Sequence, residues 1–310
     1  MKNKKLTDFD YIDTHFYHPT WEAIEKLPKK VMDKTDQTTR ITTALLLAAG
    51  TGSRLKPFTN NMPKCLTKVN EIEILGRLIT CLRENRFKRL VVVVGYFDHQ
   101  IRNFLDKNSG DIIVEYVVNA DFATTNNIYS LWLARATIKE PFLLIESDLV
   151  FEAPLLEKML IPDTIAVSQI LPWMNGTTVT PDNFVTDRVA SINLGENLNA
   201  NGYTYKTVNI YGFSLESWKR ICKRLDTWIS AGKVNDYYEA LLSEMVDDGS
   251  LNFQCVYFDT DRWYEIDTTD DLRNCEMLLQ QSRLQLAKLK HKCSSNFKRS
   301  IFKPKQRWMN

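Results

Sequence analysis

The sequence has no long run of apolar residues. Its longest apolar stretches, such as residues 43–49 and 90–94, are far too short to cross a bilayer. The first eight residues, Met-Lys-Asn-Lys-Lys-Leu-Thr-Asp, lack the apolar segment of a secretory signal. We therefore expect a cytoplasmic protein. Its composition, 44% hydrophobic and 25% charged over 310 residues, is typical of a globular α/β protein.

Cysteine pairs that could bind zinc or cycle between redox states are also missing. The six cysteines lie at positions 65, 81, 222, 255, 275 and 293, and no two of them form a Cys-x-x-Cys motif. This spacing favours reduced thiols in a cytosolic protein over a disulfide framework or a structural metal.

Two familiar glycine motifs are absent as well. Gly50 and Gly52 follow the apolar segment 44–49, but Leu55-Lys56-Pro57 stands where a P-loop would carry Lys and Ser or Thr. A dinucleotide-binding fingerprint would need a third small residue near Leu55. A P-loop and a nicotinamide oxidoreductase are therefore both disfavoured.

Instead, the two glycines are followed by Arg54 and by the pair Pro63-Lys64. Glycine lets the backbone approach a ligand closely, and backbone N–H groups together with two cations form a cradle for a triphosphate. We predict catalytic roles for Arg54 and Lys64. The predicted nucleotide-binding residues are Leu47, Ala48, Ala49, Gly50, Thr51, Gly52, Asn126, Asn127 and Ser130. For Asn126, recognition of the base and capping of the following helix are both open.

Two carboxylates stand at the ends of apolar segments far apart in the sequence. Asp148 follows Leu143–Ile145, and Asp267 closes the stretch Trp-Tyr-Glu-Ile-Asp. A triphosphate brings Mg²⁺, which prefers one or two carboxylates together with phosphate oxygens. We predict that Asp148 and Asp267 bind Mg²⁺, with a helix N-cap as the alternative for Asp267. Glu146 and Glu265, two residues before each Asp, are weaker candidates.

Apolar, β-branched segments alternate with helical ones along the chain, which predicts a Rossmann-like, mostly parallel mixed sheet flanked by helices. The predicted strands are 42–48, 90–95, 112–118, 141–145, 164–170, 189–194, 206–214 and 253–258. The predicted helices are 74–85, 98–107, 126–136, 215–231, 237–247 and 269–290. Ligands should gather at the carboxyl ends of the parallel strands.

Three regions are predicted: an aromatic-containing arm (1–40), a catalytic domain (41–285) and a basic tail (286–310). From residue 277 to the end there are nine Lys or Arg and no Asp or Glu. Contact with anionic lipid and a simple solvated tail both account for this charge, and the second is the commoner case. We expect the arm to pack on the core or on a second subunit, so a homodimer stays open. A nucleic-acid partner is not expected.

The string Leu-Ala-Ala-Gly-x-Gly-x-Arg-Leu-x-Pro-x-Thr-x-x-x-Pro-Lys-x-Leu resembles the opening motif of sugar-phosphate and alcohol-phosphate nucleotidyltransferases. Three further stretches, Lys-Thr-Val-Asn-Ile-Tyr, Tyr-Tyr-Glu and Trp-Tyr-Glu-Ile-Asp, resemble the phosphonate and phosphocholine branch of the CTP-dependent cytidylyltransferases. The resemblance implies metal-binding acids at Asp148 and Asp267, and CTP as the nucleotide. The stretch Met174-Asn175-Gly176-Thr177 departs from the Met-Asp-Gly-Thr of the phosphonate enzymes, which leaves the acceptor open.

The expected activity is transfer of CMP from CTP to a small phosphonate or phosphomonoester, with Mg²⁺ as cofactor and release of pyrophosphate. Lys206 and Asn209 would bind the acceptor's anionic end, with a solvated lysine at the end of a strand as the alternative for Lys206. A cationic end would favour aromatic faces and a carboxylate. The predicted residues for that end are Trp173, Tyr238 and Glu239, with Tyr237 beside them. The alternatives are a uridylyl-, thymidylyl- or guanylyltransferase acting on a sugar 1-phosphate, and a non-catalytic nucleotide-binding protein.

Overall fold

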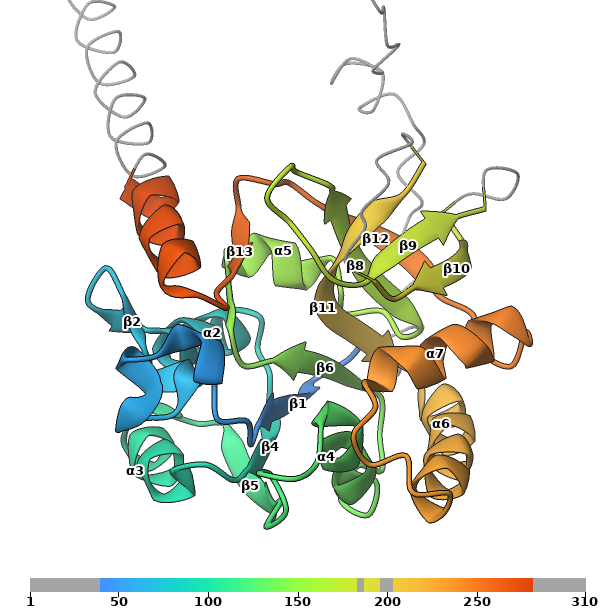
Figure 1. Ribbon diagram of the computed structural model, residues 1–310, viewed down its shortest axis with the longest axis horizontal. Helices are drawn as coiled ribbons and strands as arrows, with labels where there is room; N and C mark the ends of the chain where they lie inside the picture. The colour runs from blue at the N-terminus through green and yellow to red at the C-terminus, as the bar shows by residue number, and fades with distance from the viewer. Residues whose placement is uncertain (1–39, 183–186, 196–202, 281–310) are drawn as a thin grey trace, which may run out of the picture. The chain divides into compact units, whose positions relative to one another are not determined.

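The computed structural model describes residues 40–182, 187–195 and 203–280. Nearly all of the predicted arm and the whole predicted tail lie outside the described residues, so the three-region division stays a prediction. The described part contains a nine-stranded sheet with helices on both faces (Figure 1). Among the described helices, none is both long and apolar enough to cross a membrane.

One half of the sheet is parallel, in the order β5-β4-β1-β6. The strands are β1 (Thr43–Ala48), β4 (Arg89–Val94), β5 (Ile113–Val118) and β6 (Phe142–Glu146). Every residue of β1 is buried, because its alternate side chains enter two different cores: Leu46 packs on one face and Leu45 on the other. Burial on both faces explains why β1 is a continuous apolar run.

The other half turns antiparallel at β11, which pairs with β8 along one edge and with β9 and then β6 along the other. β12 lies parallel to β8, and β10 pairs with β9. The strands are β8 (Thr164–Gln169), β9 (Thr178–Pro181), β10 (Val189–Asn193), β11 (Tyr205–Phe213) and β12 (Gln254–Phe258).

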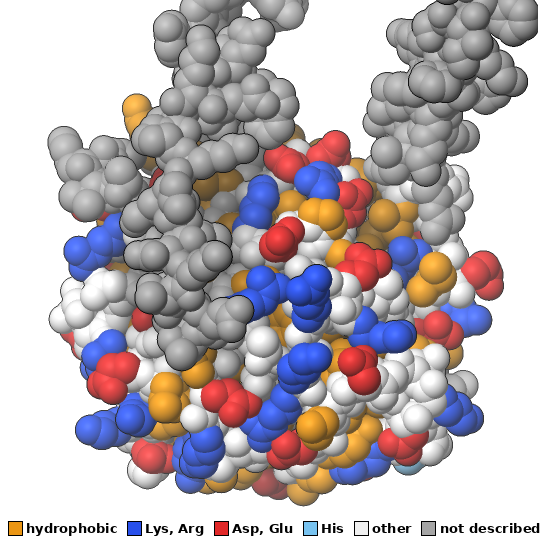
Figure 2. All heavy atoms as spheres, turned by 180° about the vertical axis from the view of Figure 1, so that it is seen from behind, with side chains coloured by type: hydrophobic (Ala, Val, Ile, Leu, Met, Phe, Trp, Pro, Cys, Tyr) orange, Lys and Arg blue, Asp and Glu red, His pale blue; other side chains and the backbone are white. Residues whose placement is uncertain are grey.

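Helices cover the two faces as separate sets. One core includes side chains of α2 (Ile74–Glu84), α3 (Asp98–Asn108) and α5 (Ala153–Glu157). The other includes side chains of α4 (Asn127–Ala134), α6 (Leu215–Ser230) and α7 (Tyr238–Asp247). On the side turned away in Figure 1, Lys, Arg, Asp and Glu are interspersed, as is typical of a solvated surface (Figure 2).

The eight predicted strands and the first five predicted helices are present, with ends shifted by a few residues at most; the sixth is helical over 269–280 and then leaves the described residues. The fold prediction is thus confirmed. The elements that were missed are short. They are β2 (Lys68–Val69), β3 (Ile72–Glu73), β7 (Leu149–Phe151), β9, β13 (Trp263–Glu265), α5, and the 3-10 turns η1 (Ser53–Leu55), η2 (Phe58–Asn60) and η3 (Lys64–Leu66).

Candidate functional site

The two motif glycines lie at the carboxyl end of β1 and have different roles. Gly52 has φ +60, and a Cβ there would lie 2.9 Å from Lys64 Cβ, so both its backbone and its packing require glycine. Gly50 has nothing within 4 Å of the position of a Cβ and borders an open hollow. Gly52 therefore forms the tight turn, while Gly50 leaves space for a ligand in the hollow that it lines.

Lys64 begins η3 and joins the two predicted acids. Its Nζ donates to Asp148 Oδ2 and Asp267 Oδ1, at 2.7 Å each. Arg54, with a side chain 66% exposed, donates to the same Asp267 oxygen at 2.7 Å. Burial alone lowers the Lys64 pKa, but the two carboxylates raise it more, and the net shift is upward. Lys64 is thus a permanent cation at this edge of the sheet.

A small two-stranded sheet outside the main one brings Asp148 and Asp267 together. β13 pairs antiparallel with β7, with Glu265 opposite Leu149. Just beyond this pair, Ile266 N donates to Asp148 O at 3.0 Å. Because Asp148 directly precedes β7 and Asp267 comes two residues after β13, the pairing of these strands brings residues more than a hundred positions apart to the same lysine.

A hollow of about 290 Å³ opens beside this cluster at the carboxyl ends of β1, β5 and β6. The predicted nucleotide-binding and catalytic residues that line it are Leu47, Ala49, Gly50, Thr51, Gly52, Arg54, Lys64, Asn126, Asn127 and Ser130. Ala48 is instead buried in the core, 4% exposed. The lining is mostly polar, as suits a charged ligand.

The amides at this hollow already have partners in the protein. Asn126 is the N-cap of α4, and its Oδ1 accepts from Asn127 N at 2.7 Å. Asn127 Oδ1 accepts from Tyr238 N, and its Nδ2 donates to Glu146. Ser130 Oγ accepts from Asn119 Nδ2. Capping by Asn126 is therefore observed, and its contact with a base stays a proposal.

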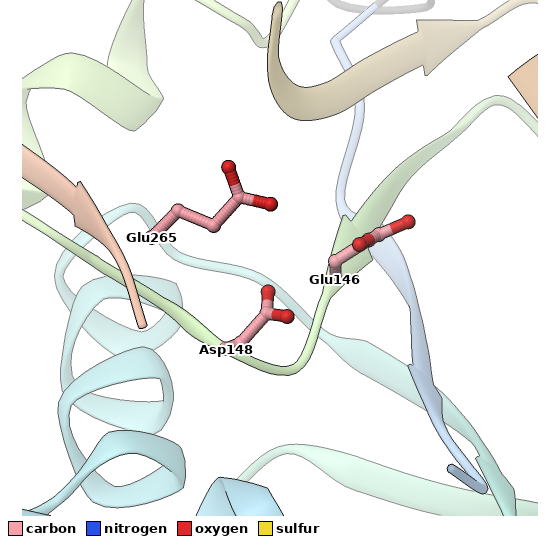
Figure 3. A group of neighbouring side chains, drawn as sticks. All are labelled: Glu146, Asp148 and Glu265. Carbon is pink, nitrogen blue, oxygen red and sulfur yellow. The ribbon is translucent and has the colours of Figure 1, made fainter. Parts of the chain in front are cut away.

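Three carboxylates lie close together, those of Glu146, Asp148 and Glu265, and each has one oxygen within 4.8 Å of an oxygen of the other two (Figure 3). Burial, followed by the charges of neighbouring acids, raises the pKa of Glu146 well above its usual value. Asp148 Oδ1 is buried without a hydrogen-bond partner among the described residues. A free oxygen inside a group of mutually repelling carboxylates fits a hard divalent cation. The two glutamates, rated weaker from the sequence, thus flank the predicted aspartate.

A second hollow, of about 630 Å³, is continuous with the cluster and is lined by three of the predicted acceptor residues, Lys206, Asn209 and Glu239. Lys206 is 2% exposed, and its Nζ lies 3.2 Å from Glu265 Oε2. No acid is adjacent to Lys206 in the sequence. Its ionic partner, Glu265, is 59 positions away and is brought to it by β13. Asn209 Nδ2 donates to the other oxygen of Glu265 at 3.0 Å.

The remaining acceptor candidates lie in three different surroundings. Glu239 is 6% exposed, and its Oε2 has no partner among the described residues; burial raises the pKa of its carboxyl to about 7. Tyr238 is fully buried and donates its hydroxyl to Glu146 at 2.9 Å. Trp173 is 59% exposed and lines a neighbouring apolar hollow instead. Tyr237, which precedes Tyr238 in the sequence, is also exposed and borders both polar hollows.

The glycine turn, the two cations and the acids thus lie together at one edge of the mixed sheet. The CTP:phosphocholine cytidylyltransferase structure from Streptococcus pneumoniae superimposes with a TM-score of 0.65 at 21% identity, covering 77% of this chain and 99% of that one. At this identity the likeness concerns the fold. Residues 44–164 match the family model of the MobA-like NTP transferase domain, which confirms the resemblance expected from the sequence.

Curated relatives extend the match along the chain. The CMP-5'-(3-aminopropyl)phosphonate synthase of Streptomyces rubellomurinus is 29% identical over 253 residues, 78% of this chain and 39% of that protein. The 2-aminoethylphosphonate cytidylyltransferase of Lancefieldella rimae is 33% identical over 110 residues, 35% of this chain and 44% of that protein. This chain spans less than half the length of these relatives.

Proposed function

We propose that this protein is a cytidylyltransferase that transfers CMP from CTP to a small phosphonate or phosphomonoester and releases pyrophosphate. The observation that supports this most is the position of Lys64, which lines the first hollow and lies 2.7 Å from Asp148 and Asp267, two acids that line both polar hollows. One hollow has the size and polarity for a nucleotide, and the other ends at the buried cation of Lys206.

In the proposed reaction, an anionic oxygen of the acceptor attacks the α-phosphorus of CTP in line. The new P–O bond forms as the bond to the pyrophosphate oxygen breaks, so pyrophosphate leaves with the bonding pair. The attacking oxygen already carries a charge, and no general base is needed. Catalysis then consists of positioning and neutralisation of charge.

Lys64 is placed to stabilise charge at the α-phosphate, because the turn at Gly52 fixes its side chain beside the nucleotide hollow. The exposed side chain of Arg54 can follow the departing pyrophosphate. Glu146, Asp148 and Glu265 would hold a divalent cation, Mg²⁺ in our proposal, which when bound neutralises phosphate charge. Asp267 would keep its ion pairs with Lys64 and Arg54.

The acceptor would lie in the larger hollow, with its anionic group at Lys206 and an amine at Glu239. The unpartnered Glu239 Oε2 favours a head that can donate an N–H, since a buried acceptor atom gains most from a hydrogen bond. An aminoalkylphosphonate has this chemistry. Choline phosphate has no N–H and would depend on aromatic faces, of which Trp173 and Tyr237 are both largely exposed.

Mass spectrometry of the products tests the proposal. The protein is incubated with Mg²⁺, each of four nucleoside triphosphates, and a panel of phosphonates, phosphomonoesters and sugar 1-phosphates. We expect a CMP adduct and pyrophosphate with CTP and an aminoalkylphosphonate. A UMP, dTMP or GMP adduct of a sugar would overturn it in favour of the alternative transferase, and no adduct at all would leave a nucleotide-binding protein.

Lys64→Ala supplies the matched test of mechanism. We expect turnover to fall by about a hundredfold or more, because a preorganised cation at a developing charge has that effect. The change also leaves two carboxylates without their shared cation, so Lys64→Arg, which retains the charge, serves as the folding control. Near-normal turnover of a folded Lys64→Ala protein would contradict the assigned role.

A further inference from the structure

β11 contains an irregularity at the residue that holds Glu265. Its pairing with β8 runs Thr207↔Val167 and resumes at Tyr211↔Ile165, so residues 208–210 stand opposite Ala166 alone. Within this bulge Asn209 has φ +58, in the left-handed region. Residues other than glycine are disfavoured in this backbone conformation. A strained conformation of this kind within a strand is retained where the surrounding structure or the function requires it.

Both polar atoms of the Asn209 side chain form hydrogen bonds with neighbouring residues. Thr207 Oγ1 donates to Asn209 Oδ1 at 2.8 Å, which fixes the orientation of the amide. The amide then donates from Nδ2 to Glu265 Oε1 at 3.0 Å. Asn209 is only 6% exposed, so this bond is largely shielded from water.

Glu265 in turn controls the acceptor lysine. Its second oxygen, Oε2, lies 3.2 Å from Lys206 Nζ, and Lys206 Nζ also donates to Thr207 O at 2.8 Å. Lys206 is 2% exposed, so its direction depends on these two partners. The bulge thus forms a closed ring of contacts from Thr207 through Asn209, Glu265 and Lys206 back to Thr207.

We propose that Asn209 is a positioning residue: through the left-handed bulge of β11 it fixes the Glu265 carboxylate, and thereby directs the Lys206 ammonium at the anionic group of the acceptor. The inference rests on the proposed function and refines the direct acceptor contact expected for Asn209 from the sequence. Glu265 is also one of the three acids proposed to hold the divalent cation, so the kinetics are measured at saturating Mg²⁺, where the inference assigns acceptor affinity, rather than CTP affinity, to this amide.

Asn209→Gly is the principal variant, because glycine keeps the left-handed backbone while it removes the amide. We expect the KM for the acceptor to rise about tenfold and the KM for CTP to stay within about twofold. Asn209→Asp should raise the acceptor KM further, because a carboxylate would face Glu265 and compete for Lys206. An unchanged acceptor KM in Asn209→Gly, or an equal rise in both KM values, would overturn the proposal.

Thr207→Val separates positioning from contact. Thr207 is fully buried, so it cannot touch the acceptor, yet its hydroxyl orients the Asn209 amide. We expect the same selective rise in acceptor KM, and less than additive effects when Thr207→Val and Asn209→Gly are combined. Additive effects, or no effect of Thr207→Val, would mean that Asn209 contacts the acceptor itself.

Asn70→Gly is the matched control. Asn70 also has a positive φ, 47°, and its amide donates to Glu276 O, but it lies between β2 and β3 and away from both polar hollows. Both KM values should stay unchanged. If the native protein transfers CMP to no acceptor, the proposed function fails and the inference with it. If the native protein is active and Asn209→Gly behaves like Asn70→Gly, the inference alone fails.

Discussion

Gly50 and Gly52 show how two identical residues in one motif answer to different constraints. Gly52 is fixed by the protein itself, through its positive φ and the side chain of Lys64 against it. Among the described residues, no atom lies within 4 Å of where a Cβ of Gly50 would be. Its constraint, in our proposal, is the nucleotide.

The two glycines therefore give opposite expectations on substitution by alanine. Gly52→Ala should cost about 1–2 kcal/mol of unfolding free energy and also lower turnover, since it displaces Lys64. Gly50→Ala should leave the melting temperature unchanged and raise the KM for CTP. Thermal melting and initial rates of pyrophosphate release measure both. Equal melting temperatures for the two variants would contradict this division.

The buried carboxyl of Glu239 predicts a pH effect. Burial is the main cause that raises its pKa to about 7. The carboxyl is therefore mostly neutral below pH 7 and mostly charged above it. An amine-bearing acceptor gains the ionic contact only above that pH. With Glu239→Gln, the acceptor KM relative to the native protein should be about tenfold higher at pH 8 and nearly equal at pH 6. The ratio of the two proteins removes the titration of the substrates, and a ratio that does not vary with pH would exclude the contact.

At the residue scale, the sequence predicted those functional side chains that come directly after an apolar segment. Asp148 and Asp267 follow apolar segments, and their convergence near Lys64 follows from that rule. The Lys206–Glu265 pair could not be predicted, because nothing near Lys206 in the sequence indicates its partner. The left-handed Asn209 was equally hidden, since asparagine tolerates this backbone without requiring it.

At the scale of elements, the N-terminus of α4 is where structure and recognition overlap. Asn126 caps this helix and also borders the nucleotide hollow. Long periodic segments such as α6 were predicted nearly residue for residue. β7 and β13 were missed because three residues carry too little pattern to distinguish a strand from a loop, and yet these two strands bring the acids together.

Asn126 variants separate its two roles. Asn126→Ala removes the cap and should cost about 1 kcal/mol, whereas Asn126→Ser retains an oxygen that can cap the helix. If Asn126 also contacts the base, Asn126→Ser should raise the KM for CTP with little change in melting temperature. Chemical denaturation and CTP kinetics on both variants give the answer. An unaltered CTP KM in Asn126→Ser would confine this residue to capping.

At the scale of the whole molecule, the candidate cation site is assembled from the main sheet and the small β7–β13 sheet. Glu146 ends the parallel strand β6 and Asp148 lies two residues beyond it, while Glu265 ends β13, near the end of the described residues. A cation bound by all three would link segments that only the folded protein brings together. Binding to the native state alone raises stability.

Mg²⁺ should accordingly raise the melting temperature of the native protein, and EDTA should lower it again and abolish CMP transfer. Asp148→Asn removes the negative charge of the carboxylate whose Oδ1 has no hydrogen-bond partner among the described residues. It should therefore remove most of the Mg²⁺-dependent shift in melting temperature. Differential scanning calorimetry with and without Mg²⁺ provides a measurement independent of activity. An identical shift in Asp148→Asn and native protein would place the cation elsewhere.

The family match ends at residue 164, whereas Lys64 reaches its second carboxylate only at Asp267. Ribosomes build chains from the amino end, so a growing polypeptide has its glycine turn and its lysine long before that last partner is made. A nascent chain that stops after the matched segment could fold its first strands but would hold Lys64 with Asp148 alone. Lys64 would thus acquire both of its carboxylate partners only after Asp267 has been synthesised.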